Sequence, residues 1–351
     1  MTSGPLVYPG GSNTYVKNHE ATGNLVVEYS RNPDDFMVNK YIQITDVKKD
    51  SGYFLSITPE EAARVLSANL DEFVWPDGAP RPQRNSGTET FNFTDYHTER
   101  YDYDFTLGDK SAQQADWDIV QTHTAIKAQQ AMTARTVAVH GLLSTDATWP
   151  TGHRSTVATI PGNTGNWEQS TVVRQDIKRS ISYAIEVIML ATLSMVRRKD
   201  LILVLGPDVA HRMSESQEIV DHIKGSPDAY NQVVGNAGKW GEYQLPDKIY
   251  GVQVVVEDAT RVTNKRGAAR ATNWVANGSN AYLLARPGQL VSPGGGPSWS
   301  TVHLFIKEDM SVETRRNEDD RRTEGHVVDD FDVVATAPSS GFNFEDTIGA
   351  A

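Results

Sequence analysis

Large apolar side chains occupy every second position in two short stretches, residues 91–94 and 101–107. The residues between them are Asn, Thr or Asp, and such alternation is typical of strands that bury one face. The polar stretch 95–100 separates the two. The pattern therefore predicts a β-hairpin with residues 95–100 at its tip.

These strands lie in an arm, residues 78–108, whose only aliphatic side chains are Ala79 and Leu107. Ordering the arm costs about 1–2 kcal/mol per residue in backbone entropy, and a lone hairpin is marginal in water. We therefore expect a second copy of the chain to cover the arm, the alternative being an exposed arm with scattered charges. The residues expected at this contact between subunits are Arg81, Arg84, Phe91, Phe93, Glu99, Arg100, Tyr101, Tyr103 and Phe105.

A long helix is predicted directly after the arm. Residues 111–143 contain no Pro, have no Gly before Gly141, and are rich in Ala, Gln and Thr. The apolar stripe of this helix is thin, which indicates a helix on a surface. The elements expected upstream are an extended N-terminal arm over 1–40, strands at 41–44 and 53–57, and a helix from Thr58 to about Leu70.

Helical and strand patterns alternate between residues 170 and 310. Apolar residues recur at helical spacing from Ser170 to Met195, and residues 201–205 form a continuous apolar run, as in a buried strand. Together these patterns predict a compact α/β lobe. The further elements expected are a helix that starts at 207, a helix near 217–223, strands at 250–256, 281–284 and 302–306, and a late strand at 327–335.

Composition narrows the class of protein. The 351 residues include no Cys, which excludes disulfides and thiolate zinc sites, and the net charge of −12 argues against a protein that grips nucleic acid through phosphate contacts. No apolar run approaches the roughly 18 residues of a membrane span. Because the N-terminus also lacks the pattern of a signal peptide, we expect the chain to fold in a cytoplasm.

The order of these elements resembles the major capsid proteins of tailed double-stranded DNA bacteriophages, which have the Hong Kong 97-type fold. The likeness covers about residues 40–345, and the order is more specific than any one motif. The passages that carry it are Phe105-Thr-Leu-Gly-Asp-Lys through Gln114-Ala-Asp-Trp-Asp-Ile, the helical stretch from Ile177, Leu203-Val-Leu-Gly-Pro-Asp-Val-Ala, Tyr250-Gly-Val-Gln-Val-Val-Val, and Val327-Val-Asp-Asp-Phe-Asp-Val-Val.

The resemblance implies an α+β chain with an extended β-hairpin loop and a long spine helix. It implies a structural protein that self-assembles into pentamers and hexamers of an icosahedral shell around a double-stranded DNA genome, without sequence-specific binding. The shell would form in the host bacterial cytoplasm and become part of the virion. The implied parts are an N-terminal arm (1–40), the start of a peripheral domain (41–77), the extended loop (78–108), the spine helix with peripheral domain (109–169), an axial domain (170–325), and a peripheral terminal strand and tail (326–351).

Two departures from the family limit what the resemblance implies. Some members join the extended loop to a neighbour through a Lys–Asn bond, but residues 51–108 contain no Lys, so we expect no such cross-link through the loop. The 40 residues before the first strand are too few for the helical scaffolding segment of other members. A separate scaffolding protein is therefore expected, although a chain already processed would look the same. A portal protein, and in some phages a decoration protein, would complete the shell.

Other candidate sites have simpler explanations. His97, His123, His140 and His153 lack the spacing of metal ligands, and the glycine-rich stretches lack the Lys-Ser/Thr of a phosphate loop. We expect no cofactor, no metal and no catalytic residue. Residues 313–332 hold eight carboxylates and four arginines, which indicate either a solvated connection or ion pairs between subunits. The four arginines are Arg315, Arg316, Arg321 and Arg322.

Two other functions stay open from the sequence. An encapsulin-like compartment that encloses cargo enzymes would have the same architecture, and fold alone does not exclude it. An α/β enzyme would place its substrate in the lobe of residues 170–310. Against the enzyme stand the missing Cys, the absent phosphate loop and the lack of a recognisable catalytic pair.

Overall fold

The computed structural model divides into two compact units. It describes residues 31–56, 92–110, 119–224, 245–265, 267–276, 278–291 and 298–349, together with 6–7, 14–15, 74–75, 77–78, 80 and 243. One unit comprises Met1–Asp35, Arg100–Ala134 and Glu308–Asp330, and the other comprises Phe36–Glu99, Arg135–Lys307 and Phe331–Ala351. The helix expected from Thr58 to Leu70 lies outside the described residues.

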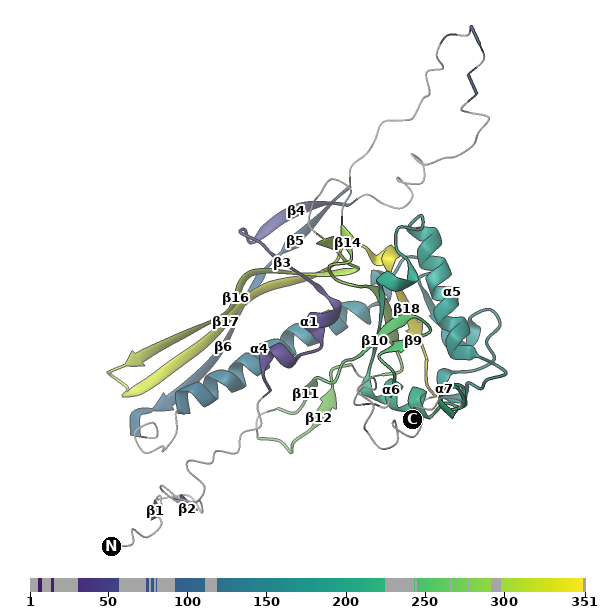
Figure 1. Ribbon diagram of the computed structural model, residues 1–351. Helices are drawn as coiled ribbons and strands as arrows, with labels where there is room; N and C mark the ends of the chain where they lie inside the picture. Colours follow the sequence, from purple (N-terminus) through teal and green to yellow (C-terminus); the bar gives the residue numbers. More distant parts are fainter. Residues whose placement is uncertain are drawn as a thin grey trace. The chain divides into compact units, whose positions relative to one another are not determined.

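A four-stranded sheet has the order β3-β16-β17-β6, as Figure 1 shows. Its strands are β3 (Gln43–Asp46), β16 (Val302–Asn317), β17 (Arg322–Ala335) and β6 (Glu99–Gly108). The first five residues of β16 are all buried, whereas most of its second half is exposed. The strands predicted at 302–306 and 327–335 are confirmed, and both extend further than their apolar pattern.

The long helix α4 spans Ile119–Leu143 (Figure 1). The prediction of a helix over 111–143 is confirmed from Ile119 onward, and residues 111–118 lie outside the described part of the chain. Ala131, Met132, Val139 and Leu143 are buried, while Ile126 is exposed. The apolar stripe is thus thin, as the sequence predicts.

The larger unit is built on a six-stranded sheet with the order β7-β18-β13-β8-β10-β9. At its centre, β8 (Leu201–Leu205) pairs in parallel with β10 (Val252–Val256) and antiparallel with β13 (Ala281–Ala285). All five residues of β8 are buried, because the strand is covered on both faces. The outer strands are β9 (Lys248–Ile249), β18 (Phe342–Glu345) and β7 (Arg154–Thr156), the last two from outside residues 170–325.

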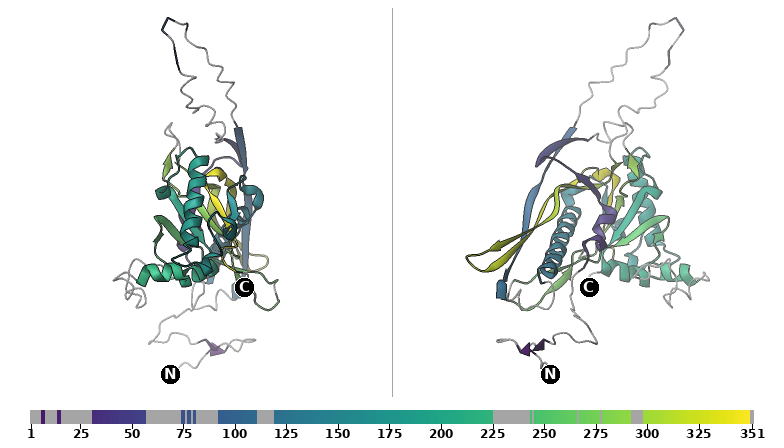
Figure 2. Two further views of the ribbon diagram at one scale, coloured as in Figure 1. Left: turned by 90° about the vertical axis from the view of Figure 1, so that its right-hand side faces the viewer. Right: turned by 60° about the vertical axis from the view of Figure 1, so that its left-hand side comes forward.

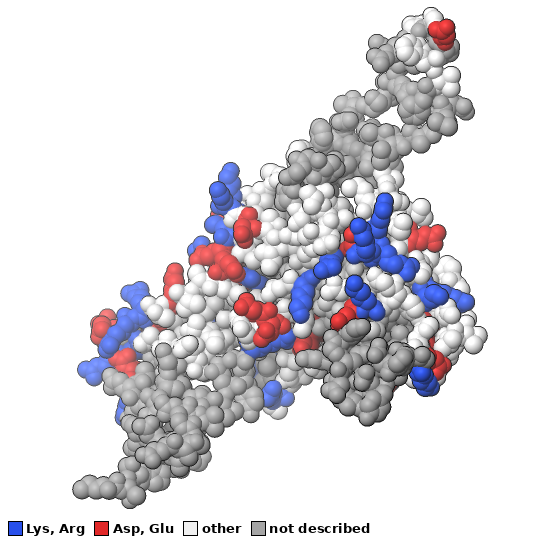
Figure 3. Space-filling view, in the orientation of Figure 1, with Lys and Arg blue, Asp and Glu red and all other residues white. Residues whose placement is uncertain are grey.

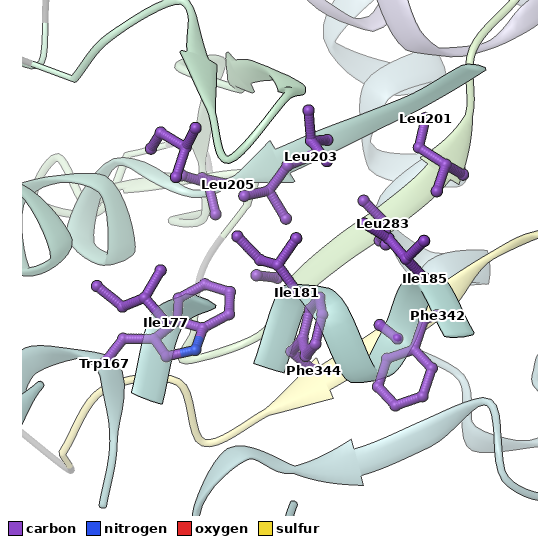
Figure 4. Close-up of a cluster of buried hydrophobic side chains, with 14 of the residues drawn as sticks. Trp167, Ile177, Ile181, Ile185, Leu201, Leu203, Leu205, Leu283, Phe342 and Phe344 are labelled. Carbon is purple, nitrogen blue, oxygen red and sulfur yellow. The ribbon is translucent and has the colours of Figure 1, made fainter. Parts of the chain in front are cut away.

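The main hydrophobic core lies between this sheet and helix α5 (Asp176–Ala191). Ile177, Ile181 and Ile185 recur at helical spacing and point toward the sheet (Figure 4). Phe342 and Phe344 of β18 pack beside them, and both rings are fully buried. The apolar face of α5, which repeats every 3.6 residues, and the apolar face of β18, which repeats every second residue, thus form one buried layer.

Helix α5 begins later than the sequence predicts. Its first residue is Asp176, whereas the predicted cap was Ser170. Ser170 still serves the helix, because its Oγ accepts the backbone N–H of Asp176 at 2.9 Å. The intervening chain forms a turn that brings Ser170 back to the helix start, and Gln175 adopts a left-handed conformation there.

Several short elements complete the chain, and Figure 2 shows them from two further sides. Helices predicted near 207 and 217–223 are confirmed as α6 (Pro207–Glu215) and α7 (Gln217–Lys224). The others are α1 (Val38–Tyr41), β1 (Leu6–Val7), β2 (Thr14–Tyr15), β4 (Ser51–Ser56), β5 (Asn92–His97), β11 (Thr260–Val262), β12 (Thr272–Trp274), β14 (Leu290–Val291) and β15 (Ser298–Trp299).

The hairpin predicted from residues 91–94 and 101–107 is wrong in its pairing. β5 pairs antiparallel with β4, from Ser51 opposite His97 to Ser56 opposite Asn92, while β6 belongs to the four-stranded sheet. The expected tip, residues 95–100, is mostly strand, with a single break at Thr98. Alternation shows which face of a strand is apolar but not which strand lies beside it, so the partner was misassigned.

Candidate inter-subunit contact surface

Strands β4 and β5 form a two-stranded ribbon with one buried and one exposed face. On the inner face, Phe54 and Tyr96 stack on Phe305 of β16, with ring centroids 5.8 and 4.7 Å away. On the outer face, the side chains of Tyr53 and Phe93 are 77% and 63% exposed. Because Tyr53 lies opposite Asp95, and Phe93 opposite Leu55, the two exposed rings are diagonal neighbours on the same face.

Hydrogen bonds and an ion pair fix the base of the ribbon. The Thr98 backbone N–H donates to the carbonyl of Asp50, and the His97 N–H donates to the Asp332 carboxylate, both at 2.8 Å. Lys307 forms an ion pair with the Asp50 side chain. The ribbon is therefore held at its base while its outer aromatic face stays free in the single chain.

Gly52 allows the inner face to close. A Cβ at this position would lie 2.6 Å from the Tyr96 hydroxyl and 2.8 Å from its ring. The absence of a side chain at the residue opposite thus leaves room for Tyr96 to cross the ribbon and reach Phe305. A side chain at position 52 would therefore have to displace the Tyr96 ring from its place on Phe305.

The aromatic residues of β6 are covered largely within the chain. Phe105 and Leu107 are buried, and the Phe105 ring stacks on His123 with centroids 5.7 Å apart. Phe105 also lies across Gly325 of β17, where a side chain would collide with it. The Phe105 ring is therefore buried within its own chain. Its contact with a second subunit was predicted because the ring was expected to need cover from another copy, and that argument is wrong for this residue. Tyr101 remains 38% exposed.

Of the charged residues predicted at the contact, Arg100 lies near carboxylates of its own chain. Arg100 lies 3.7 Å from Glu308 and 3.9 Å from Asp330. Glu99 is exposed, and Tyr103 is half-buried. Their contact with a second subunit stays a prediction. Arg81, Arg84 and Phe91 lie outside the described residues.

The arginines predicted to pair between subunits flank the turn from β16 to β17. Arg316 contacts Asp109 at 3.0 Å and Glu318 at 2.9 Å. Arg322 contacts Glu324 at 2.7 Å, and this hydrogen bond lowers the pKa of the Glu324 carboxyl. These two arginines therefore help to order the turn of their own chain. The ion pairs expected between subunits for all four, including Arg315 and Arg321, stay a prediction.

One contact candidate was missed from the sequence. Tyr53 was predicted to lie in a strand but not at a contact. It stands directly before Phe54, so the two side chains point to opposite faces of that strand. The signal was hidden because both residues are aromatic, so period two does not separate the inner face from the outer. Pairing with β5 resolves this, since Phe54 reaches Phe305 and Tyr53 does not.

Buried titratable groups elsewhere in the larger unit form a structural network. The Tyr41 hydroxyl donates to Glu257 at 2.9 Å, so at 3.0 Å it accepts from Nε2 of His140. Burial lowers the pKa of His140 to about 4, and burial together with Glu257 raises the pKa of Tyr41. The network joins α1, α4 and the end of β10 through a neutral imidazole.

Neither metal-ion binding nor a membrane span is indicated by the described residues. Within them, no three His, Cys, Asp or Glu side chains come close enough together to hold a metal ion. In that same part of the chain, no helix combines the length and the apolar character needed to cross a membrane.

The fold is similar to solved capsid structures, although no protein-family model and no curated protein matches the sequence. A phage-related protein from Bordetella bronchiseptica RB50 aligns with a TM-score of 0.58 and 14% identity, over 88% of this chain and 92% of that one. The capsid of cyanophage P-SCSP1u gives 0.57 and 10%, over 97% and 96%. The mature capsid of bacteriophage PhiM1 gives 0.56 and 9%, also over 97% and 96%.

These alignments establish the fold. They cover nearly all of both chains, at identities too low to carry over individual residues. The predicted α+β architecture of the Hong Kong 97-type capsid fold is confirmed.

Proposed function

We propose that this protein, which has the Hong Kong 97-type capsid fold, is the major capsid protein of a tailed double-stranded DNA bacteriophage. It assembles through pentamers and hexamers into an icosahedral shell around the genome. The observation that carries the proposal is the fold, shared over nearly the full length of two phage capsid chains. Fold alone does not fix function, so assembly itself must be tested.

The ribbon of β4 and β5 supports the proposal. Its exposed aromatic pair, Tyr53 and Phe93, is the kind of large apolar surface that marks contact with another protein. A two-stranded ribbon is marginal by itself, and packing on a neighbour would stabilise it. A neighbouring subunit covers the ribbon in the shell, together with the exposed Tyr101 of β6 and the charged side chains of Glu99 and Arg100.

The remaining parts of the proposal concern partners and place. The shell forms in the host bacterial cytoplasm with a separate scaffolding protein, and it closes with a portal protein. It encloses DNA without sequence-specific contacts, in keeping with the net charge of −12. The role is structural, with no cofactor and no catalytic residue.

Negative-stain electron microscopy of the purified protein tests the proposal. We expect closed polyhedral particles from the wild type, and only capsomers or free subunits from a variant carrying Tyr53→Ser and Phe93→Ser. The matched control replaces two exposed apolar strand residues elsewhere, Val262→Ser and Val291→Ser, which are 64% and 58% exposed. The control should still form particles.

The outcomes separate the competing functions. A small uniform oligomer in the wild type would contradict the capsid proposal and return the α/β lobe to the list of possible enzymes. Particles from the ribbon variant would contradict the role of the aromatic pair in assembly but not the capsid proposal itself. An encapsulin-like compartment would form particles that contain cargo protein and no DNA, so nucleic-acid content of particles from infected cells distinguishes the two.

A further inference from the structure

In the described part of the chain, the second half of β16 has an unpaired edge. Within the four-stranded sheet, β16 has β17 on one side and β3 on the other, but β3 pairs only with residues 303–306. Beside residues 308–317, no described strand lies on the β3 side of β16. Because every second residue of a strand directs its N–H and C=O groups to a given edge, this edge can receive another strand.

Both faces of this half of β16 are exposed as well. Val312 is 50% exposed, and the four residues after it are all exposed. Successive side chains of a strand point to opposite faces, so this run of exposed residues lies on both faces of the sheet. A second strand can therefore approach the edge without displacing side chains that pack on this part of β16.

The sequence of the edge is complementary to itself. It reads Glu308-Asp-Met-Ser-Val-Glu-Thr-Arg-Arg, with two acids at one end, two arginines at the other and Val312 at the centre. When this strand runs antiparallel to its own copy with Val312 opposite Val312, Glu308 stands opposite Arg316. In the same register Asp309 stands opposite Arg315. Each pair occurs twice about the centre, and cross-strand pairs of opposite charge stabilise a sheet.

The charged side chains are accessible for such a contact. Arg315 is exposed and makes no ion pair with a described residue of its own chain. The side chain of Arg316 contacts Asp109 at 3.0 Å and is still 58% exposed, and that of Glu308 is 36% exposed beside Arg100. Figure 3, in the orientation of Figure 1, shows basic and acidic side chains close together at the tip of β16 and β17.

An irregularity of the strand at Met310 is compatible with this match. Met310 has a φ of 22°, and a bulge in a strand shifts the residues beyond it by one position against the partner strand. The two acids are consecutive and so are the two arginines, so a shift of one position still sets a carboxylate opposite a guanidinium. Val312 lies on the other side of Met310 from the acids, so it remains opposite its own copy.

We propose that residues 308–316 of β16 pair antiparallel with the same residues of a second copy of this chain, about a two-fold axis at Val312. The two sheets join edge to edge, and the two acids of each copy pair with the two arginines of the other. Such a contact is isologous and closes on two copies. The inference rests on the proposed function, since an icosahedral shell relates neighbouring subunits by two-fold axes.

Disulfide trapping tests the pairing directly, because the wild-type chain has no Cys. In Val312→Cys the two thiols meet at the axis, with Cα atoms about 4.5–5.5 Å apart, which suits a disulfide. The matched control is Thr314→Cys, at another exposed position of β16. Its two Cα atoms lie about 14 Å apart, since each is two residues from the axis.

Particles of both variants are oxidised with copper phenanthroline and separated on non-reducing gels. We expect about tenfold more covalent dimer from Val312→Cys than from Thr314→Cys. Equal yields of dimer from the two variants, or no dimer from either, would overturn the pairing. Circular dichroism before oxidation confirms that the variants fold like the wild type.

Exchange of charges tests the ion pairs. In the Val312→Cys background, Asp309→Arg sets two cations opposite each other, and Arg315→Glu sets two anions opposite each other. Each variant alone should give about tenfold less dimer than Val312→Cys. An equal mixture of the two should restore the yield as dimers with one chain of each kind, identified by mass, because a basic edge then meets an acidic one. Equal yields from all four samples would contradict the ion pairs.

Electron microscopy of the same samples separates this inference from the proposed function. Particles in which Val312→Cys gives no dimer would overturn the pairing and leave the capsid function standing. Dimers from protein that forms no particles would support the pairing and refute the proposed function. Neither particles nor dimers would refute both.

Discussion

Glu218 is a buried carboxylate that holds the first turn of α5. Its side chain is fully buried and accepts the backbone N–H groups of Ile177 and Lys178 at 3.1 and 3.2 Å, together with the hydroxyls of Ser170 and Tyr250. These bonds satisfy donors that the helix start leaves without partners, and the negative charge suits the positive end of the helix dipole. One side chain of α7 thus fixes where α5 begins.

We predict that Glu218→Gln lowers the free energy of unfolding by about 2–3 kcal/mol, because an amide oxygen accepts more weakly and the amide NH₂ meets hydroxyls and N–H groups that are donors. Urea unfolding of unassembled subunits measures the change. Glu186→Gln on the exposed side of α5 is the control and should stay within about 0.5 kcal/mol of the wild type. Equal effects at the two positions would show that Glu218 does not cap the helix.

His140 predicts how subunit stability depends on pH. Its pKa is lowered by burial to about 4 in the folded chain, against an unfolded value near 6.5, and Tyr41, Glu257, Tyr282 and Arg261 are the polar groups around it. The unfolded chain therefore binds the extra proton first, so stability falls as pH drops from 6.5 toward 4.

Between pH 7 and pH 5 we expect His140 to account for a loss of about 2 kcal/mol in the free energy of unfolding. His140→Gln keeps an N–H donor for Tyr41 but cannot titrate, so this variant should lose about 2 kcal/mol less than the wild type over the same range. His211→Gln, at an exposed position, is the control. Urea titrations at the two pH values measure the difference, and identical pH profiles for wild type and His140→Gln would rule out the effect.

At the scale of the element, the pairing of β6 with β17 depends on the fit of Phe105 over Gly325. We predict that Gly325→Ala destabilises the subunit by about 1–3 kcal/mol, because the new methyl group overlaps the Phe105 ring. Phe105→Leu in the same chain should recover part of the loss, since leucine leaves room for the methyl. A double-mutant cycle measured by urea unfolding gives the coupling. Additive effects would show that the two residues do not contact each other.

Most helices and strands could be predicted from the sequence, but the pairing of the strands could not. The apolar run of β8 and the helical spacing in α5 each reflect a local period, so both were predicted. The partner of β5 depends on β4, separated from it by residues 57–91, and no local pattern records that choice. For the same reason Phe105 was assigned to a second subunit: a sequence shows that a ring needs cover, but not which chain supplies it.

At the scale of the whole molecule, the net charge of −12 decides whether the subunit can bind DNA through phosphate contacts. Binding to duplex DNA without sequence preference requires several cations to neutralise phosphates, and such proteins reach dissociation constants of about 10⁻⁴–10⁻⁶ M at physiological salt. Lys40, Lys248 and Arg286 line a hollow beside β10. Asp247 and Asp258 line the same hollow, so the three cations do not form the unbroken basic surface that a duplex needs.

We therefore predict that unassembled subunits bind a labelled DNA duplex more weakly than about 10⁻⁴ M at about 0.15 M salt, as measured by fluorescence anisotropy. The Lys40→Glu, Lys248→Glu and Arg286→Glu variant should be indistinguishable from the wild type, because neither neutralises phosphates. Micromolar binding that falls steeply with added salt, and is lost in this variant, would contradict the prediction and show that these three cations bind DNA phosphates.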